Sequence, residues 1–445
     1  MLSLFYTFIA TLLFFFDIIT DNQYYLLPVL SIVLLFFFIF DILRRDYSFV
    51  IMASFFIFSI VLVGISNLYI EFGNYITEEA RFGLQIGSTT SYIAISIWFL
   101  LIGKLVFNAS DKIYIPIGKI NINPYLIFLF FLFFELSYLY LLISHGSPLL
   151  RGEERFTYWL DAPLFYQKLN LVFPLMFVLL GMLMAHHNKK SFNLISVFLI
   201  SFYVILLIFF SEKFSGLILV LFNFSIGFFV VKFDKSNFKI VIKHFLILGI
   251  IMIALLVVVF VNMQVVYGYD TQQAFDRFIS RVFGLQGHVW YGIVHEYRFE
   301  NLDLGFRELF IDFDGDESNP TGLVALMWKI APHDLVEHMR MSSIRFTMGW
   351  PAIVLATYGW LGVIVSTIIS AVMTGIIFRF MYNAIVNTNY VALALLMVLY
   401  RGLTSAFLMG DLFTLYKSTT LVAVAGIFLL ILVFFQQKSS KEKNV

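Results

Sequence analysis

Two arginines four residues apart occur in a short polar segment between two long apolar runs. The segment reads HGSPLLRGEERFTYWLDAP, and the arginines are Arg151 and Arg155. Residues four apart share a helix face, and two guanidinium groups can hold a diphosphate through charge-assisted hydrogen bonds. The segment therefore predicts an anion site. The alternative is a solvated loop in which Glu153 and Glu154 neutralise the two arginines.

Further cations lie at the ends of other apolar runs. Lys213 follows Glu212 in the turn FFSEKFSG, where a tight turn needs polar residues in any case. The segment LVEHMRMSSIRFTMGWP contains His338, Arg340 and Arg345 just before an apolar run. Since histidine is the usual general base near neutral pH, this segment predicts an anion site with a proton acceptor. Interfacial anchoring of the chain is the competing interpretation.

The segment RFISRVFGLQGHVWYGIVHEYRF has apolar residues at helical spacing and a polar opposite face. This pattern predicts an amphipathic helix that lies on the membrane surface. Arg281, Gln286 and His288 are on the polar face, where they are candidates for contact with a sugar or a phosphate. Simple packing of the helix is the alternative.

Three ionisable residues lie within or beside apolar runs. Glu135 and Arg401 fall deep inside two of them. A charge at the centre of a membrane helix costs roughly 2.5–3.5 kcal/mol on insertion scales, so each should face protein or a cavity. A Glu135–Arg401 pair that locks the helices together and a role in a substrate path both fit. Asp411, at the outer end of a run, is the carboxylate best placed near the outer cations.

The elements that must position these residues are membrane helices. Of the 445 residues, 61% are hydrophobic and 13% are charged, whereas soluble domains are about 45–50% apolar and about 25% charged. The net charge of +1 and the lack of a basic stripe exclude a nucleic-acid partner. The chain contains no cysteine, which excludes disulfides and thiolate metal sites.

Apolar runs of about 20 residues predict an all-α polytopic membrane protein with about twelve spans. The predicted spans are 2–20, 26–43, 47–70, 86–107, 124–144, 165–185, 192–211, 215–231, 244–266, 348–378, 388–409 and 413–436.

Lysines and arginines concentrate in alternate connecting segments, which the positive-inside rule places in the cytoplasm together with both termini. The basic segments contain Arg44, Arg45, Lys104, Lys112, Lys119, Lys189, Lys190, Lys232, Lys235, Lys239, Lys243, Arg379, Lys438, Lys441 and Lys443. The chain then divides into nine spans over 1–266, a large outer loop with amphipathic helices over 267–347, and three spans with a short basic tail over 348–445. The sequence contains no nucleotide-binding or metal-binding motif, so no cofactor is predicted.

Several of these features occur together in one known family. They are the number of spans, the HGSPLLRGEER segment after the fifth span, the SEKFSG turn two spans later, and a large outer loop that ends in Arg340 and Arg345 before GWPAIVLATYGWLGVI. Arg401 in LYRGLTSAF, in the penultimate span, fits the same pattern. In this arrangement the chain resembles the Wzy-type O-antigen and oligosaccharide repeat-unit polymerases.

The resemblance implies a metal- and nucleotide-independent glycosyltransferase of GT-C-like architecture in the bacterial inner membrane. Its partners would be undecaprenyl-diphosphate-linked oligosaccharides, membrane lipids and a chain-length regulator protein. On the periplasmic face, the non-reducing end of one repeat unit would attack C1 of the growing chain's reducing sugar. Undecaprenyl diphosphate would then leave.

This implied reaction needs cations beside the departing diphosphate and a base for the attacking hydroxyl. His338 is the first candidate for the base and Asp411 the second. Trp159, Trp290 and Tyr291 are the expected sugar-stacking residues. The expected diphosphate ligands are the outer cations Arg155, Lys213, Arg340 and Arg345, followed by Arg151 and Arg281.

Two other functions share much of this pattern. An O-antigen ligase has the same architecture and chemistry but uses lipid A-core as the acceptor, and physical reasoning on the sequence does not separate it from a polymerase. A lipid-linked oligosaccharide flippase should place its cations along a central cavity, whereas the cations outside the basic segments lie mostly in outer loops here.

Overall fold

The computed structural model is built from helices and connecting turns, with no β-strand among the residues it describes. It describes residues 2–20, 25–76, 78–79, 82–112, 120, 122–153, 155–187, 189–212, 214–233, 256–257, 260–261, 264, 268–297, 322–341 and 346–442. A helix satisfies its backbone hydrogen bonds internally, which is what a chain in lipid requires.

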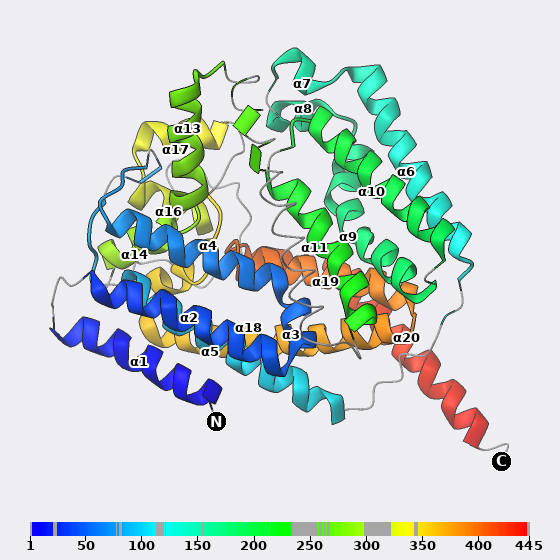
Figure 1. Cartoon of the computed structure of the whole chain (residues 1–445), viewed down its shortest axis with the longest axis horizontal. Helices are drawn as coiled ribbons and strands as arrows, with labels where there is room; N and C mark the ends of the chain where they lie inside the picture. The colour runs from blue at the N-terminus through cyan, green and yellow to red at the C-terminus, as the bar shows by residue number, and fades with distance from the viewer. Residues whose placement is uncertain are drawn as a thin grey trace. The chain divides into compact units, whose positions relative to one another are not determined.

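The helices follow one another along the chain as labelled in Figure 1. They are α1 (Leu2–Thr20), α2 (Leu26–Arg45), α3 (Tyr47–Met52), α4 (Ser54–Glu71), α5 (Ser88–Ala109), η1 (Ser110–Lys112), α6 (Pro124–His145), α7 (Pro148–Arg151), α8 (Arg155–Asp161), α9 (Leu164–His187), α10 (Lys190–Phe209), α11 (Phe214–Phe233), α13 (Thr271–Ile279), η2 (Ser280–Gly284), α14 (His288–Tyr297), α16 (Gly322–Ile330), α17 (His333–Met341), α18 (Ala352–Val386), α19 (Tyr390–Phe407), η3 (Leu412–Leu415) and α20 (Ser418–Glu442).

In the described part of the chain, ten segments are long and apolar enough to cross a membrane. Each corresponds to one of the predicted spans. The predicted span 215–231 is the helix α11, whose apolar stretch Gly216–Lys232 is shorter than the others. The predicted span 244–266 lies outside the described residues, apart from five scattered positions. The all-α polytopic class is therefore confirmed, while the number twelve stays a prediction.

Two predicted spans differ in detail from the helices observed. The span predicted over 47–70 is broken at Ala53 into α3 and α4. The span predicted over 348–378 runs on to Val386 as α18, with a kink at Gly359, where φ is 63°. A helix of 35 residues would be about 50 Å long, well beyond a hydrocarbon core of about 30 Å, and the kink divides it.

The chain forms two compact units, each built from several stretches of sequence. Unit 1 contains Met1–Tyr114, Ile279–Arg379 and Leu399–Val422. Unit 2 contains Ile115–Phe278, Phe380–Val398 and Ala423–Val445. The boundaries of these units differ from the predicted boundaries at 266 and 347. Most of the described part of the large loop packs with the first four spans and does not form a separate region.

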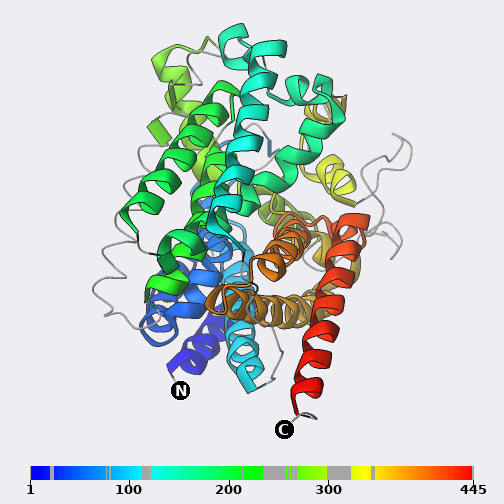
Figure 2. The ribbon, with the colours of Figure 1, turned by 90° about the vertical axis from the view of Figure 1, so that its right-hand side faces the viewer.

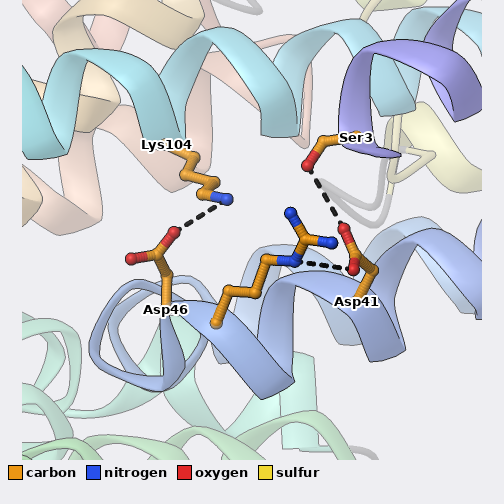
Figure 3. A network of polar contacts seen from close by, with 5 residues as sticks. Ser3, Asp41, Asp46 and Lys104 are labelled. Atoms are coloured by element: carbon orange, nitrogen blue, oxygen red, sulfur yellow. Dashed lines mark hydrogen bonds and ion pairs between the residues drawn. The ribbon is translucent and has the colours of Figure 1, made fainter. Parts of the chain in front are cut away.

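Within unit 1, α1, α2 and α5 lie side by side (Figures 1 and 2). Polar contacts join them at one end, which we call the basic end (Figure 3). The Lys104 Nζ atom of α5 is 2.7 Å from a carboxylate oxygen of Asp46. Ser3 of α1 donates a hydrogen bond of 3.3 Å to Asp41 of α2. The end of α2 is thus joined to the last turns of α5 and to the start of α1.

A second set of polar contacts lies at the opposite end of the same helices, which we call the loop end. Asp17 of α1 accepts a 3.0 Å hydrogen bond from the Gly87 backbone amide. Glu71 of α4 accepts from both the backbone amide and the hydroxyl of Thr89, at 3.0 and 2.8 Å. Both carboxylates therefore lie at the N-terminus of α5, where the helix dipole favours negative charge. Each end joins segments that the charge pattern places on the same side.

Unit 2 contains a close helix pair, α9 and α11, which lie side by side (Figure 1). The pair meets at Gly181 and Gly227, where a β-carbon on either residue would overlap a backbone carbonyl oxygen of the other helix. Small residues that allow backbones to approach are typical of helix packing in membranes. The interior also contains an aromatic cluster, with Phe173, Phe177 and Tyr203 in mutual ring contact.

Candidate functional site

The predicted anion segment after the fifth span folds into two short helices at one end of unit 2. Gly146 ends α6 with φ of 78°, a left-handed value that favours glycine. Ser147 then caps α7 by accepting from the Leu150 amide, and its hydroxyl donates a 2.7 Å hydrogen bond to the Phe209 carbonyl at the end of α10. This contact ties α7 to the turn between α10 and α11.

Arg155, at the start of α8, is held by that same turn. Its Nη1 atom lies 2.5 Å from the Oε2 atom of Glu212, and the two side chains are 17% and 10% exposed. Two segments that are separated by more than fifty residues in sequence are thus joined through one charge-assisted hydrogen bond. The sequence predicts Glu212 only as a polar residue of a tight turn, and it does not predict the contact with Arg155.

Arg151 and Arg155 do not share a helix face, so that prediction is wrong. Arg151 ends α7 and Arg155 begins α8, because Gly152 adopts a left-handed conformation with φ of 65° between them. The exposed Arg151 side chain lies against Gly146, where a β-carbon would overlap the guanidinium group. Lys213, predicted beside these arginines, lies outside the described residues.

Trp159 of α8 packs inward, against the aromatic interior of unit 2. Its ring centroid is 5.0 Å from that of Phe210 and 6.4 Å from that of Tyr138. The indole Nε1 is buried and makes no hydrogen bond with any described residue. Trp159 therefore helps to build the wall beneath α8, and this contact uses ring surface that a sugar would need.

In unit 1, the predicted amphipathic surface helix is divided and partly buried, which corrects the prediction. A π-helical turn, η2, separates α13 from α14. Trp290 and Tyr291 of α14 are each 1% exposed, and they donate hydrogen bonds to the carbonyls of Ser88 and Gly83 at 2.9 and 2.7 Å. These two aromatic residues anchor α14 in the core of unit 1 and are not available for sugar stacking in this structure.

Ser66, in the middle of the apolar helix α4, fixes the turn that precedes α14. Its hydroxyl accepts a 2.7 Å hydrogen bond from the Gly287 amide and donates to the Gly284 carbonyl. The neighbouring Asn67 is fully buried, and neither polar atom of its amide has a hydrogen-bond partner among the described residues. The sequence signal for this contact was a Ser-Asn pair inside a predicted span. The predicted ligands Arg281 and Gln286 are half-buried around this turn.

His288, predicted as a polar-face residue, is fully buried. Its Nδ1 atom is 2.6 Å from the Leu285 carbonyl, so Nδ1 carries the proton and Nε2 is the basic nitrogen. Nε2 has no hydrogen-bond partner in the described part of the chain. The ring packs edge-on against Phe346, with centroids 4.4 Å apart. Burial lowers the pKa of His288 to about 4, although Glu78 and the Leu285 carbonyl act in the opposite direction.

This lowered pKa predicts acid destabilisation that the variant His288→Asn should lack. The folded protein keeps His288 neutral to about pH 4, while the unfolded chain binds a proton below about pH 6.5. The contribution of His288 to the free energy of unfolding is therefore complete above pH 6.5. Below that pH it falls by about 1.4 kcal/mol per pH unit, which amounts to on the order of 3 kcal/mol at pH 4. The measurement is the melting temperature in detergent across that range. His338→Asn, at an exposed position, should keep the wild-type pH profile; equal profiles for wild type and His288→Asn would contradict the prediction.

The predicted base and anion ligands of the loop's last segment lie on α17 in unit 1. His338 is exposed and Arg340 is half-buried. Residues two apart point to different sides of a helix, so the two side chains do not face the same ligand from α17 alone. Arg345 lies outside the described residues. Phe346, the residue after it, packs on His288, which places the end of this segment beside α14.

Asp411 follows α19 and lies near the same segment. The Gly349 amide donates a 3.2 Å hydrogen bond to the Met409 carbonyl, and a β-carbon on Gly410 would contact the backbone of Gly349, so residues 349–350 run beside 408–410. The Ser405 hydroxyl is 3.5 Å from the Asp411 Oδ2 atom. Asp411, the predicted second candidate for the base, is therefore two residues from Met409, whose carbonyl binds the start of the next span.

The two intramembrane charges belong to different units. Glu135 of α6 is fully buried in unit 2, and both carboxylate oxygens are without a hydrogen-bond partner among the described residues. Arg401 of α19 is half-buried in unit 1. The predicted Glu135–Arg401 pair stays a prediction.

An apolar cavity of about 470 Å³ lies between α1, α5 and α18 in unit 1. Its walls are aliphatic and aromatic, and its lining includes Phe14, Phe15, Ala94, Trp98, Trp360 and Ile364. The Trp98 indole donates a 3.0 Å hydrogen bond to Thr11, which uses the polar atoms of two lining residues within the wall. The cavity suits a hydrocarbon chain.

No group of three or more histidine and acidic side chains in the described ranges has the geometry to hold a metal ion.

The fold defines a multi-pass α-helical membrane protein. A protein family of unknown function, DUF6418, matches residues 316–424. That range contains α16 to α19 and carries the predicted site residues from His338 to Asp411. No curated protein and no solved structure matches the chain.

Proposed function

We propose that this protein is a membrane-embedded glycosyltransferase that polymerises oligosaccharide repeat units carried on undecaprenyl diphosphate. The reaction joins C1 of the growing chain's reducing sugar to a hydroxyl oxygen at the non-reducing end of an incoming unit. The bond from C1 to the diphosphate oxygen breaks, undecaprenyl diphosphate leaves, and the hydroxyl proton passes to a base. In this proposal the loop ends of the helices face the periplasm, as the positive-inside rule requires.

The observation that carries the proposal is the contact between Arg155 and Glu212. The two loops that carry the family resemblance in this half of the chain meet at this pair. A half-buried guanidinium at the end of a membrane helix bundle is a preorganised cation, and such groups stabilise charge on a departing phosphate. Glu212 holds the Arg155 side chain in place, and an incoming diphosphate would compete for the same guanidinium.

The remaining roles follow the sequence interpretation. The other outer cations that the sequence predicts as diphosphate ligands remain candidates for phosphate contacts: Arg151, Lys213, Arg281, Arg340 and Arg345. His338 is exposed and accessible to substrate, so it remains the first candidate for the base, and Asp411 the second. Gln286 remains a candidate for sugar contact. A chain-length regulator would be a protein partner.

The cavity in unit 1 supports a lipid-linked substrate. A prenyl chain is a branched hydrocarbon. Because lipid tails are as apolar as the cavity wall, such a chain would be bound through close packing contacts with the side chains of the cavity. Ile364 lines the cavity and is 57% exposed. Leu361 lies one turn away on the same helix, is 73% exposed and does not line the cavity.

Ile364→Trp is therefore expected to raise the KM for the lipid-linked substrate without unfolding the protein, because the larger ring narrows the cavity. The measurement is the rate of glycan extension by purified protein at several substrate concentrations. Leu361→Trp is the matched control and should keep the wild-type KM. An unchanged KM in Ile364→Trp would remove the cavity from the tail-binding proposal.

A direct test uses a deletion strain and lipopolysaccharide gels. Loss of a polymerase should leave single repeat units on the lipid A-core, whereas loss of a ligase or a flippase should leave the core without any repeat unit. With purified protein in lipid, conversion of lipid-linked repeat units into longer glycans with release of undecaprenyl diphosphate supports the proposal. Transfer to lipid A-core alone would instead identify an O-antigen ligase.

A further inference from the structure

The interior of unit 2 contains a buried acid that the proposed reaction does not use. Glu135 is 0% exposed, halfway along α6, and neither carboxylate oxygen makes a hydrogen bond with any described residue. A lone ionised carboxylate is very unfavourable in a low-dielectric interior, so this group needs either a proton or polar partners. Ionisable residues inside membrane helices often belong to proton relays.

Two buried tyrosine hydroxyl groups lie near Glu135. Tyr138 is one helical turn away on the same face of α6, and Tyr203 of α10 packs against it with ring centroids 5.7 Å apart. The two side chains are 1% and 0% exposed, and their hydroxyl groups are close enough to interact with each other, while neither has the geometry of a hydrogen bond to another described residue. Glu135 and Glu212 both lie close enough to Tyr203 to act on it electrostatically.

The cluster continues from these tyrosines toward α8. The Trp159 ring lies 6.4 Å from that of Tyr138, and the Tyr158 ring lies 5.8 Å from that of Trp159. The Tyr158 hydroxyl and the Trp159 Nε1 are also buried without a hydrogen-bond partner among the described residues. Burial raises the pKa of Tyr158 to about 12, and the nearby Arg151 opposes that shift, so this hydroxyl can donate a hydrogen bond at neutral pH.

A purely structural role explains this cluster poorly. Glu71, a fully buried acid of unit 1, is a useful comparison. Its carboxylate accepts two hydrogen bonds from Thr89, as expected for a carboxyl group with a structural role. Buried polar groups are nearly always hydrogen-bonded, and where protein groups do not suffice, bound water completes the set. In the Glu135 cluster, several such groups lie together in one continuous stretch.

We infer that Glu135, Tyr138, Tyr203 and Tyr158 surround a chain of bound water molecules, along which the Glu135 carboxyl exchanges a proton with the solution beside α8. The site takes water and protons as its ligands, and it is independent of the proposed glycosyl transfer. The titratable and charged groups around it are Tyr138 on α6, Arg151 on α7, Glu153 between α7 and α8, Arg155 and Tyr158 on α8, Tyr166 on α9, Tyr203 on α10, and Glu212 in the turn after α10.

The test is infrared difference spectroscopy on the full chain in lipid nanodiscs. The probe is the C=O stretch of a protonated carboxyl and its shift when H₂O is replaced by D₂O. Wild-type protein should show a band component that Glu135→Gln removes and Glu71→Gln leaves in place. Glutamine is nearly isosteric with glutamate, so the fold should survive, and retention of the other bands would show that it does.

The route of exchange is tested by removing single hydroxyl groups. Tyr203→Phe and Tyr158→Phe should slow the D₂O shift of the Glu135 band. Tyr125→Phe, at the opposite end of α6 and 59% exposed, should leave the rate unchanged. The inference is overturned if Glu135→Gln removes no band, or if both tyrosine variants exchange at the wild-type rate.

Discussion

Replacing Arg155 by alanine should abolish glycan chain extension and leave the protein in the membrane at a normal level. Removing one preorganised donor from a charge-stabilising site typically lowers the rate by about 100- to 1,000-fold. The measurement is the ladder of lipopolysaccharide chain lengths in a deletion strain that carries the variant, together with the rate of extension by purified protein. A normal ladder would remove Arg155 from the diphosphate site.

The partner of Arg155 makes it possible to separate catalysis from structure. Because Arg155 pairs with Glu212 at 2.5 Å, Arg155→Ala also leaves a nearly buried carboxylate behind, which is destabilising in itself. Glu212→Gln disturbs the same pair but keeps the cation, so it should retain activity. The double variant should regain stability and remain inactive. If all three variants lost activity in proportion to their stability, Arg155 would have only a structural role.

Arg45 provides a matched control for this experiment. It forms an ion pair with Asp41 at 2.9 Å, four residues away on the same helix at the basic end of unit 1, so Arg45→Ala removes the same kind of side chain from an ion pair outside the proposed site. It should leave chain extension unchanged. Loss of extension in this control would show that ion pairs anywhere in the protein affect activity through stability.

Replacing Gly227 by leucine should prevent the protein from folding. The Gly227 backbone lies against the Val178 carbonyl, and even a single β-carbon there would overlap that oxygen. Overpacking a buried site by a few atoms usually destabilises by about 1–3 kcal/mol. Here the obstacle is backbone in both directions, since Gly181 lies equally close to Phe224, so α9 and α11 would have to separate.

The measurement is the yield of monodisperse protein after size-exclusion chromatography in detergent, with the melting temperature of whatever remains. Gly227→Ala should already lower the melting temperature, and Gly227→Leu should abolish the monodisperse peak. Gly402 of α19 is the matched control, because a β-carbon there would be 3.4 Å from the nearest atom of Thr420, an ordinary contact. Equal melting temperatures for Gly227→Ala and Gly402→Ala would show that the close pair does not limit stability.

The sequence by itself determined the class of the fold and most of its elements. Long apolar runs have one stable backbone conformation in lipid, so the ten described spans could be located from composition and length alone. The charge pattern also predicted which segments lie together. Lys104 and Asp46 meet at one end of α5, and Thr89 and Glu71 at the other, as that pattern requires.

Only the tertiary structure decided which polar residues contact one another. Local spacing placed Arg151 and Arg155 on one face, but a left-handed glycine between them breaks the helix. The pattern of α14 predicted a surface helix. In the structure, Trp290 and Tyr291 are buried and donate hydrogen bonds to the carbonyls of Ser88 and Gly83. Spacing reports on neighbours along a helix, whereas Glu212, which binds Arg155, and Phe346, which packs on His288, come from distant segments. Those contacts depend on how the helices pack, which hydrophobic periodicity does not encode.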